Sequence, residues 1–272
     1  MSHLFQVGVG SGGVVVLDLV ARDSRIAKVT IVEPDRYKSH NVHRHLFPIS
    51  AIGRLKGELA AKWLQLRRPE LVVEVLPVDV TAKEHQAAIE NAVATCDVAI
   101  CAVDNELAKY HFDHLMRTAR KPWTLGEVLS GGIAGWVHRF LPDGPCYGCV
   151  ASYLQREAPG DPAAPLPDYN HPGGAVLETT IPAPKASINT IASLHALVTL
   201  GMLETASSTV GADFTSLLFT MKRVPDVFDE PFRSHKFRIP RSVSCLICSA
   251  SGPTGGELDA ALDDAMARLG HE

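Results

Sequence analysis

A glycine-rich turn near the start of the chain is the sequence feature that most constrains its fold. The run Leu4–Val9 is largely apolar and predicts a short buried strand, and Gly8, Gly10 and Gly13 have the spacing G-x-G-x-x-G. The first two glycines permit a tight turn and a close approach of the backbone to phosphate, and the third lets the next helix pack against the strand. This stretch therefore predicts a strand-to-helix turn suited to phosphate groups.

The residues after the turn extend it to a nucleotide-binding unit. Gly13–Arg22 predicts a helix whose N-terminal amides face the turn, where unpaired N–H groups and the helix dipole stabilise a polyphosphate. The apolar run Val29–Val32 predicts a second strand that ends at Glu33, where an acid about 20 residues after the glycines binds a ribose hydroxyl. Ligand-free tight turns also favour glycine, so the glycines alone are a weak signal, and Glu33 strengthens the nucleotide interpretation.

Strand and helix patterns alternate along most of the chain, and this predicts the fold class. Because consecutive parallel strands need helical crossovers, the alternation favours an α/β fold with a doubly wound, mostly parallel, Rossmann-like sheet. The polar segment Tyr37–Ile49 predicts a loop at the carboxyl edge, where ligands bind. The expected strands are Val72–Val78, Val98–Val103, Trp123–Leu125, Gly131–Phe140, Leu217–Val224 and Phe237–Ile239, and the expected helices are Lys56–Arg67, Ala82–Ala94, Lys109–Arg120 and Ala186–Glu204.

The two Cys-x-x-Cys pairs of the sequence predict a metal site. Cys146 and Cys149 form one Cys-x-x-Cys pair, Cys245 and Cys248 form another, and a long insertion separates them. In a reducing compartment such pairs favour tetrahedral Zn²⁺ ligation over disulfides, although a redox dithiol is the alternative for either pair. A closed Cys₄ site would add a C-terminal zinc-bound extension that ties the segment after Phe140 to the last strand.

Composition and charge exclude several function classes. The formal net charge is −4 and no long basic run is present, so binding to nucleic acid is not expected. No apolar run reaches the ~18–20 residues needed to span a bilayer, and the start lacks a signal-peptide pattern, so we expect a cytoplasmic protein without membrane contact. The length favours one domain over residues 1–248, followed by a tail at 249–272 with a weak, acidic helix pattern. The proline-rich stretch Gln155–Gly174 predicts an extended loop.

A series of short motifs resembles one enzyme family. In order, these are the glycine turn, Glu33-Pro34-Asp35, Asn41-Val42-His43-Arg44, Gly53-Arg54-Leu55-Lys56, Asp104-Asn105 and the two cysteine pairs. The order resembles the ThiF/MoeB/HesA family of adenylating enzymes, which includes sulfur-carrier adenylyltransferases and the adenylation domain of ubiquitin-activating enzymes. The resemblance implies a homodimer that uses ATP and Mg²⁺ to convert the C-terminal glycine carboxylate of a ubiquitin-like or sulfur-carrier protein ending in Gly-Gly into an acyl adenylate. It also implies an ATP-binding half at about 1–140 and a zinc- and carrier-binding half at about 141–248.

The resemblance implies a role for each motif residue. Glu33 would hold the ribose, Arg44 and Lys56 would contact the phosphates, and Asp104 would bind Mg²⁺. This agrees with the chemistry, because attack of a carboxylate on the α-phosphate brings two anions together and needs preorganised positive charge. Arg44, Lys56 and Asp104 are the implied catalytic residues. The implied nucleotide-binding set is Gly8, Gly10, Gly12, Gly13, Glu33, Asp35, Asn41, Arg44, Lys56, Asp104 and Asn105.

Each of these residues also has a simpler interpretation. Asp104 could cap the helix that follows it, as aspartate commonly does. Arg44 and Lys56 could be solvated surface charges, and Asn41 could only form a turn. The functional interpretation depends on finding all of them in order behind the glycine turn.

The chain also departs from the family pattern. Many relatives carry a catalytic cysteine before the long late helix, but Val150–Ser244 contains none, and the other two cysteines, Cys96 and Cys101, are predicted core thiols. We therefore expect adenylation without an enzyme thioester. The usual leading helix with an arginine for the partner subunit is not in this sequence, so that arginine is absent, comes from another chain or lies in a longer protein. The glutamine that commonly follows the phosphate-binding arginine is His45 here.

Three alternative functions stay open. The missing arginine and cysteine fit a nucleotide-binding but non-catalytic scaffold subunit of a heterodimeric activating enzyme. An NAD-type dehydrogenase would explain the glycines and Glu33, but it leaves Asn41, Arg44 and Lys56 unexplained. A tRNA-modifying dehydratase of the same family is disfavoured by the cysteine pairs and by the absence of a basic stretch.

Overall fold

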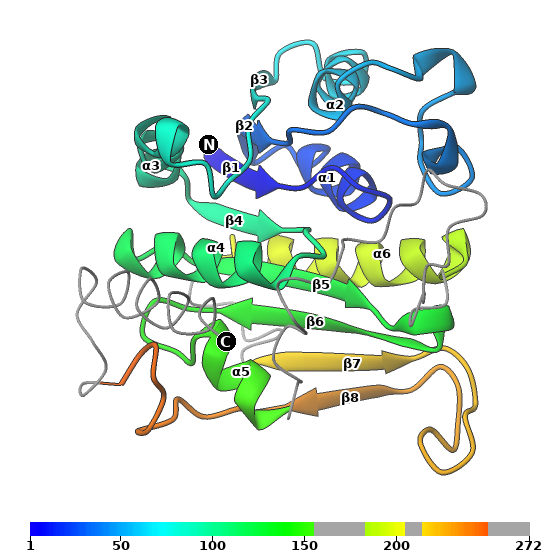
Figure 1. Cartoon of the computed structure of the whole chain (residues 1–272), viewed down its shortest axis with the longest axis vertical. Helices are drawn as coiled ribbons and strands as arrows, with labels where there is room; N and C mark the ends of the chain where they lie inside the picture. Colours follow the sequence, from blue (N-terminus) through cyan, green and yellow to red (C-terminus); the bar gives the residue numbers. More distant parts are fainter. Residues whose placement is uncertain (155–182, 205–213, 250–272) are drawn as a thin grey trace, which may run out of the picture.

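The computed structural model describes residues 1–154, 183–204 and 214–249, which fold around a single sheet. The eight strands have the order β3-β2-β1-β4-β5-β6-β7-β8 (Figure 1). Strands β1 to β5 pair in parallel, whereas β6, β7 and β8 pair antiparallel. The strands are β1 (Ser2–Val7), β2 (Ile26–Val32), β3 (Val72–Leu76), β4 (Val98–Cys101), β5 (Trp123–Val128), β6 (Ala134–Phe140), β7 (Ser216–Thr220) and β8 (Ser234–Phe237). The predicted doubly wound, mostly parallel α/β fold is confirmed.

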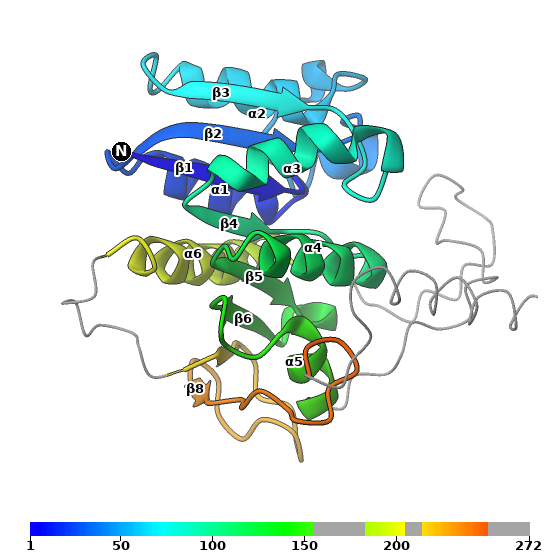
Figure 2. The same cartoon turned by 90° about the vertical axis from the view of Figure 1, so that its left-hand side faces the viewer.

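Helices cover both faces of the sheet. The α-helices are α1 (Gly13–Ala21), α2 (Lys56–Gln65), α3 (Gln86–Thr95), α4 (Glu106–Thr118), α5 (Tyr147–Tyr153) and α6 (Lys185–Gly201). Helices α3 and α4 lie on one face, and α1 and α6 lie on the other (Figure 2). Short 3₁₀ turns occur at η1 (Ser39–Asn41), η2 (Ile49–Ala51), η3 (Lys83–His85) and η4 (Ser130–Gly132).

The period-two pattern of the strands separates the two large hydrophobic clusters on the opposite faces of the sheet. Leu4 of β1 packs with α1, α2 and α6, whereas the next residue, Phe5, packs with α3, α4 and α5. The second core contains a stack of Trp123 on Phe140 with ring centroids 4.0 Å apart. Both faces of the central strands β1 and β4 are therefore buried, as expected where helices cover both sides of a sheet, whereas β3 at the sheet edge is partly exposed.

The strand order places the carboxyl ends of β1 and β4 side by side. Val7 is the register partner of Cys101, and the chain runs outward in opposite directions from these two strands, toward β2 and β3 and toward β5. Such a reversal leaves a crevice beyond the strand ends, where open α/β sheets bind ligands. The glycine turn after β1 and the Asp104-Asn105 pair after β4 therefore meet at one edge of the sheet.

Several element boundaries differ from the predicted ones. Helix α4 begins at Glu106, three residues before the predicted Lys109, because Asn105 caps it. Strand β5 continues to Val128 instead of ending at Leu125 because β6 pairs with it over this extra length. At the sheet edge, β7 ends at Thr220 and β8 is Ser234–Phe237, earlier than the apolar residues alone predicted.

Two predicted segments lie wholly or almost wholly outside the described residues. These are the proline-rich stretch Gln155–Gly174 and the C-terminal tail at 249–272, of which only Ser249 is described. Among the helices that the structure describes, none is both long enough and apolar enough to cross a lipid bilayer.

Candidate functional site

A cavity of about 840 Å³ lies beyond the carboxyl ends of β1, β2 and β4. It is lined by the entire set of residues predicted to bind nucleotide, which are Gly8, Gly10, Gly12, Gly13, Glu33, Asp35, Asn41, Arg44, Lys56, Asp104 and Asn105. These residues come from five separate stretches of sequence, and the fold brings them to one place. The cavity is therefore the candidate functional site.

The glycine turn forms the floor of this cavity and needs its glycines for different reasons. Gly8 has a φ of +90°, and a Cβ at Gly13 would lie 2.5 Å from the carbonyl oxygen of Gly8, so α1 packs on the turn only without a side chain there. A Cβ at Gly10 would meet no atom within 4 Å, so Gly10 borders open space. Gln6, which sequence analysis missed, fixes the turn by donating to the carbonyls of Gly8 and Gly13 at 2.9 and 2.8 Å.

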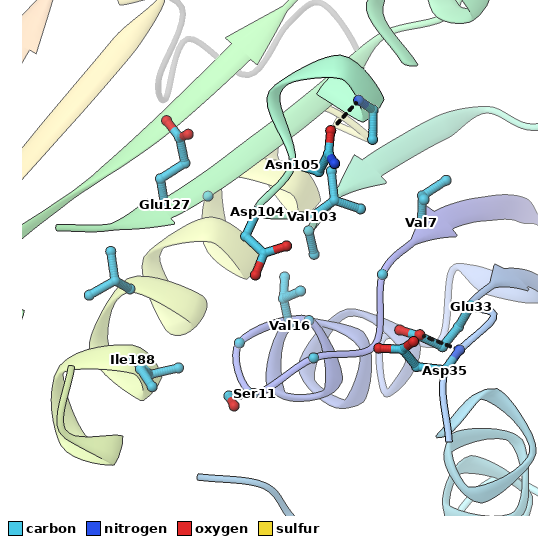
Figure 3. A pocket seen from close by; sticks show the side chains of 18 of the residues that line it. Val7, Ser11, Val16, Glu33, Asp35, Val103, Asp104, Asn105, Glu127 and Ile188 are labelled. Carbon is cyan, nitrogen blue, oxygen red and sulfur yellow. Dashed lines mark hydrogen bonds between the residues drawn. The ribbon is translucent and has the colours of Figure 1, made fainter. Parts of the chain in front are cut away.

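Glu33 is buried at the end of β2 and braces the same turn. Its carboxylate accepts the backbone N–H groups of Val9 at 2.5 Å and Asp35 at 2.9 Å, and the second contact is drawn in Figure 3. Burial raises the pKa of Glu33, while Lys56 and the two N–H donors oppose that rise. Each carboxylate oxygen has two lone pairs, so Glu33 keeps acceptor capacity for a hydroxyl group.

His45 binds the carbonyl group of the same residue, Val9. Its Nε2 lies 2.9 Å from the carbonyl oxygen of Val9, which can only accept, so Nε2 carries the proton. The pKa of His45 is lowered to about 4, mainly by burial and in part by the nearby Lys56 and Lys185, while the hydrogen bond to Val9 opposes the shift. The backbone of Val9 is thus bound at both its N–H and its carbonyl group. The buried side chain of His45 therefore helps to fix the conformation of the turn.

The positively charged groups enter from the segment after β2. Lys56 begins α2, is largely buried, and its Nζ lies 2.7 Å from Oδ2 of Asp35. Arg44 is half-buried and lines the same cavity. Asn41 uses its side-chain oxygen to accept the N–H of Lys38 at 2.9 Å, so it does form a turn as well as line the cavity.

Asp104 and Asn105 have different roles at the start of α4. The side-chain oxygen of Asn105 accepts the N–H of Ala108 at 3.1 Å, so Asn105 is the helix cap. In Figure 3 the carboxylate of Asp104 points instead into the space between the glycine turn and α6. The capping interpretation thus applies to Asn105, and the exposed carboxylate of Asp104 offers hard oxygen ligands of the kind Mg²⁺ prefers.

A buried ionic network at the far side of the cavity was not predicted. Nζ of Lys109 lies 2.5 Å from Glu106 and 2.6 Å from Glu127, and His138 lies 3.3 Å from the other oxygen of Glu127. Burial lowers the pKa of Lys109, but the two carboxylates outweigh it, so the net shift is upward. The signal that could have found this network is Glu127, an acid at the carboxyl end of a buried strand.

The four paired cysteines converge at the end of the domain opposite α2. Their ligand atoms all lie within 4.8 Å of one another, and all four residues are buried. The Sγ atoms are 3.7 Å apart for Cys146 and Cys149, 3.5 Å for Cys146 and Cys245, and 3.4 Å for Cys149 and Cys248. Tetrahedral thiolates around Zn²⁺ would be about 3.8 Å apart, so the cluster fits a zinc ion.

The remaining cysteines are unsuited to nucleophilic chemistry. Cys96 and Cys101 are completely buried, and burial raises the pKa of each thiol to about 12. Within residues 1–154, 183–204 and 214–249, every cysteine outside the cluster is therefore a core thiol.

The sequence is similar to one protein family and to several curated proteins. The model of the ThiF family matches residues 1–225. The SAMP-activating enzyme E1 of Haloferax volcanii is 27% identical over 150 residues, which are 55% of this chain and 53% of that protein. The adenylyltransferase and sulfurtransferase UBA4 of Candida albicans is 28% identical over 159 residues, which are 58% of this chain and 35% of that protein.

Solved structures show the same fold. The crystal structure of E. coli MccB with ATP superposes with a TM-score of 0.65 and 16% identity, covering 91% of this chain and 67% of that one. The complex of MccB with N-formylated MccA gives a TM-score of 0.67, also at 16% identity. The chain matches only about a third to a half of the length of the curated relatives. Because the family model extends over most of the sequence, this chain belongs to the ThiF family.

Proposed function

We propose that this chain is an ATP- and Mg²⁺-dependent adenylyltransferase. Its substrate would be the C-terminal glycine carboxylate of a ubiquitin-like or sulfur-carrier protein, which it would convert into an acyl adenylate. The observation that carries this proposal is that Lys56, Arg44 and Asp104 line one cavity together with the glycine turn. The names of the curated relatives, an E1 activating enzyme and an adenylyltransferase, support the same reaction class.

The cavity supplies what this reaction needs. A carboxylate oxygen of the carrier attacks the α-phosphorus of ATP, a P–O bond forms to that oxygen, and the bond to the pyrophosphate oxygen breaks. No side chain has to act as nucleophile. Lys56 and Arg44 would reduce the repulsion between the two anions and stabilise the charge that builds on the phosphate oxygens. Asp104 would hold Mg²⁺, which supplies further charge neutralisation when bound.

The nucleotide would be oriented by the braced turn. Phosphates would occupy the open space beside Gly10 and accept from the amides at the start of α1, and Glu33 would accept a ribose hydroxyl. Gln6, Glu33 and His45 hold this turn in place before any ligand binds, so little reorganisation is needed at the moment of reaction.

We further propose that the adenylate is passed on without a thioester on this chain. The four clustered cysteines fit structural zinc, and both remaining thiols are buried with raised pKa values. The division into an ATP-binding part at about 1–140 and a zinc- and carrier-binding part at about 141–248 belongs to the same proposal, as does a homodimeric assembly.

Pyrophosphate exchange into ATP tests the proposal. The purified chain is mixed with ATP, Mg²⁺, labelled pyrophosphate and a small carrier protein ending in Gly-Gly, and the matched control carrier has one extra C-terminal residue. We expect exchange only with the Gly-Gly terminus. If the chain binds ATP but exchanges only after addition of a second subunit, the non-catalytic scaffold function is correct instead. If the chain prefers NAD to ATP, the adenylation proposal is wrong.

A further inference from the structure

Tyr147 connects the cysteine cluster to the start of α4. It lies between Cys146 and Cys149, and its side chain is completely buried. Its hydroxyl donates to Oε2 of Glu106 at 2.7 Å, and its backbone N–H donates to Oδ1 of Asp113 at 3.0 Å. Helix α5 is therefore tied to α4 at two points, one of which is the first residue of α4.

Two side chains hold Glu106 in place. Besides the Tyr147 hydroxyl, it binds Lys109 one turn along α4, and Lys109 binds Glu127 on β5 at 2.6 Å. The Lys109 side chain is only 6% exposed, so these charged contacts are poorly screened by water. Glu106 directly follows the Asp104-Asn105 pair, so whatever holds Glu106 also holds the backbone that carries Asp104.

The position of Tyr147 in turn depends on the cysteines. Cys146 caps α5, with its Sγ accepting the N–H of Cys149 at 3.4 Å, and Tyr147 is the first residue of that helix. Gly148 lies so close to Ile247 that a Cβ at Gly148 would be 2.6 Å from the Ile247 side chain. The first turn of α5 is thus set by how the two Cys-x-x-Cys pairs come together.

We propose that Tyr147 is a positioning residue that couples the metal state of the cysteine cluster to magnesium–nucleotide binding at Asp104. This inference builds on the proposed function. Loss of the hydroxyl leaves Glu106 without one donor and lets the first turn of α4 shift. Mg²⁺ needs near-ideal octahedral ligands at about 2.0–2.1 Å, so a small shift of Asp104 weakens its binding, whereas nucleotide contacts at the glycine turn stay in place.

The test compares Tyr147→Phe with Tyr153→Phe in the full chain. Tyr153 lies on the same helix but is 55% exposed, so it is the matched control. For each protein the zinc content is measured by metal analysis, and ATP affinity is measured with and without Mg²⁺. Hydrogen exchange of the Ala108 and Lys109 amides provides a readout that is independent of activity, because both amides are bonded to Asn105.

We expect Tyr147→Phe to keep its zinc and to bind ATP without Mg²⁺ as the wild type does. Its affinity for ATP with Mg²⁺ should fall about 5- to 10-fold, and the two amides should exchange faster. Zinc-depleted wild type should show the same faster exchange, and zinc depletion of Tyr147→Phe should add little.

Other results would overturn the inference. If Tyr147→Phe matches Tyr153→Phe in magnesium–nucleotide affinity and in amide exchange, the coupling does not exist. If Tyr147→Phe loses its zinc, the residue supports the cysteines only. If wild type binds no ATP in any condition, the proposed function fails, and the exchange of the two amides with and without zinc still decides whether the cysteine cluster and α4 are linked.

Discussion

Nζ of Lys56 lies 2.7 Å from Oδ2 of Asp35 at the edge of the candidate nucleotide cavity. The Lys56 side chain is 10% exposed, whereas that of Asp35 is 59% exposed. The carboxylate thus holds the ammonium group in place while remaining accessible to water, which screens the pair. A phosphate with more negative charge can therefore replace Asp35 as the partner of Lys56 without leaving a buried carboxylate unpaired.

Lys56→Met should reduce pyrophosphate exchange about 100-fold, which is the usual cost of one charge-stabilising group in a transition state. Because Asp35 is well exposed, loss of its ion pair with Lys56 should by itself change the free energy of unfolding by less than about 1 kcal/mol, and the pKa of the buried Glu33 should rise because Lys56 no longer opposes that rise. Lys62→Met, an exposed position on the same helix, is the control and should exchange like wild type. Equal exchange rates for the two variants would remove Lys56 from the mechanism.

Substitutions at Asp104 and at Asn105 should have different effects, the first on the Mg²⁺ requirement and the second on stability. Asp104→Asn keeps the shape of the side chain but removes its charge, so the Mg²⁺ requirement for exchange should rise at least 10-fold with little change in the melting temperature. Asn105→Ala removes the α4 cap and should lower the free energy of unfolding by about 1 kcal/mol. An Asp104→Asn protein that titrates with Mg²⁺ like wild type would contradict the assigned role.

The cysteine cluster should bind a single zinc ion per chain, because four thiolates form a closed tetrahedral site. Cys245→Ser removes one ligand, so metal analysis should show loss of zinc, and the melting temperature should fall. Cys96→Ala is the control, since it removes a buried thiol outside the cluster and should keep the zinc. Purified protein that contains disulfides in place of metal would favour the redox alternative.

Acid should destabilise the fold partly through His45. Its pKa falls from 6.5 to about 4 on folding, so the unfolded chain takes up more protons and stability is lost as the pH drops through this range. For His45 alone, the loss between pH 7 and pH 5 should be about 2 kcal/mol. His45→Gln keeps a donor for the Val9 carbonyl but cannot titrate, so its urea unfolding should depend less on pH.

The control for this measurement is His43→Gln, an exposed histidine two residues earlier. Its unfolding free energy should change with pH as that of wild type does. If His45→Gln loses as much stability as wild type between pH 7 and pH 5, His45 does not stay neutral in the folded protein over this range.

The features that could be predicted from the sequence are formed by residues that lie close together in the chain. The glycine turn, the acid at Glu33 and the two Cys-x-x-Cys pairs each occupy a short stretch whose spacing already fixes their geometry. The alternation of strands and helices then required a parallel sheet, and a parallel sheet brings strand ends together. Because the strand ends lie together, the residues around Gly10 and those around Asp104 line one cavity, as predicted. Their roles in binding and catalysis are still predictions.

The missed features depend on contacts between distant segments. Gln6 is a polar residue in an apolar strand, and only the folded turn shows that it binds two carbonyl groups. The Lys109–Glu127 pair joins α4 to β5, and no local pattern relates these residues. Strand β8 is mostly polar and exposed, so its bounds follow from its pairing with β7 and not from its own composition.

Calorimetric titration of ATP with Mg²⁺ into wild type, Gly10→Ala and Gly201→Ala tests directly whether the cavity beside the glycine turn binds nucleotide. A methyl group at either glycine meets no atom within 4 Å, so both variants should fold with unchanged melting temperatures. At Gly10, however, the methyl group occupies the space proposed for phosphate. Wild type and Gly201→Ala should bind one ATP, and Gly10→Ala should bind it at least 10-fold more weakly. Equal affinity in Gly10→Ala and wild type, or no binding by wild type, would contradict the proposed nucleotide site.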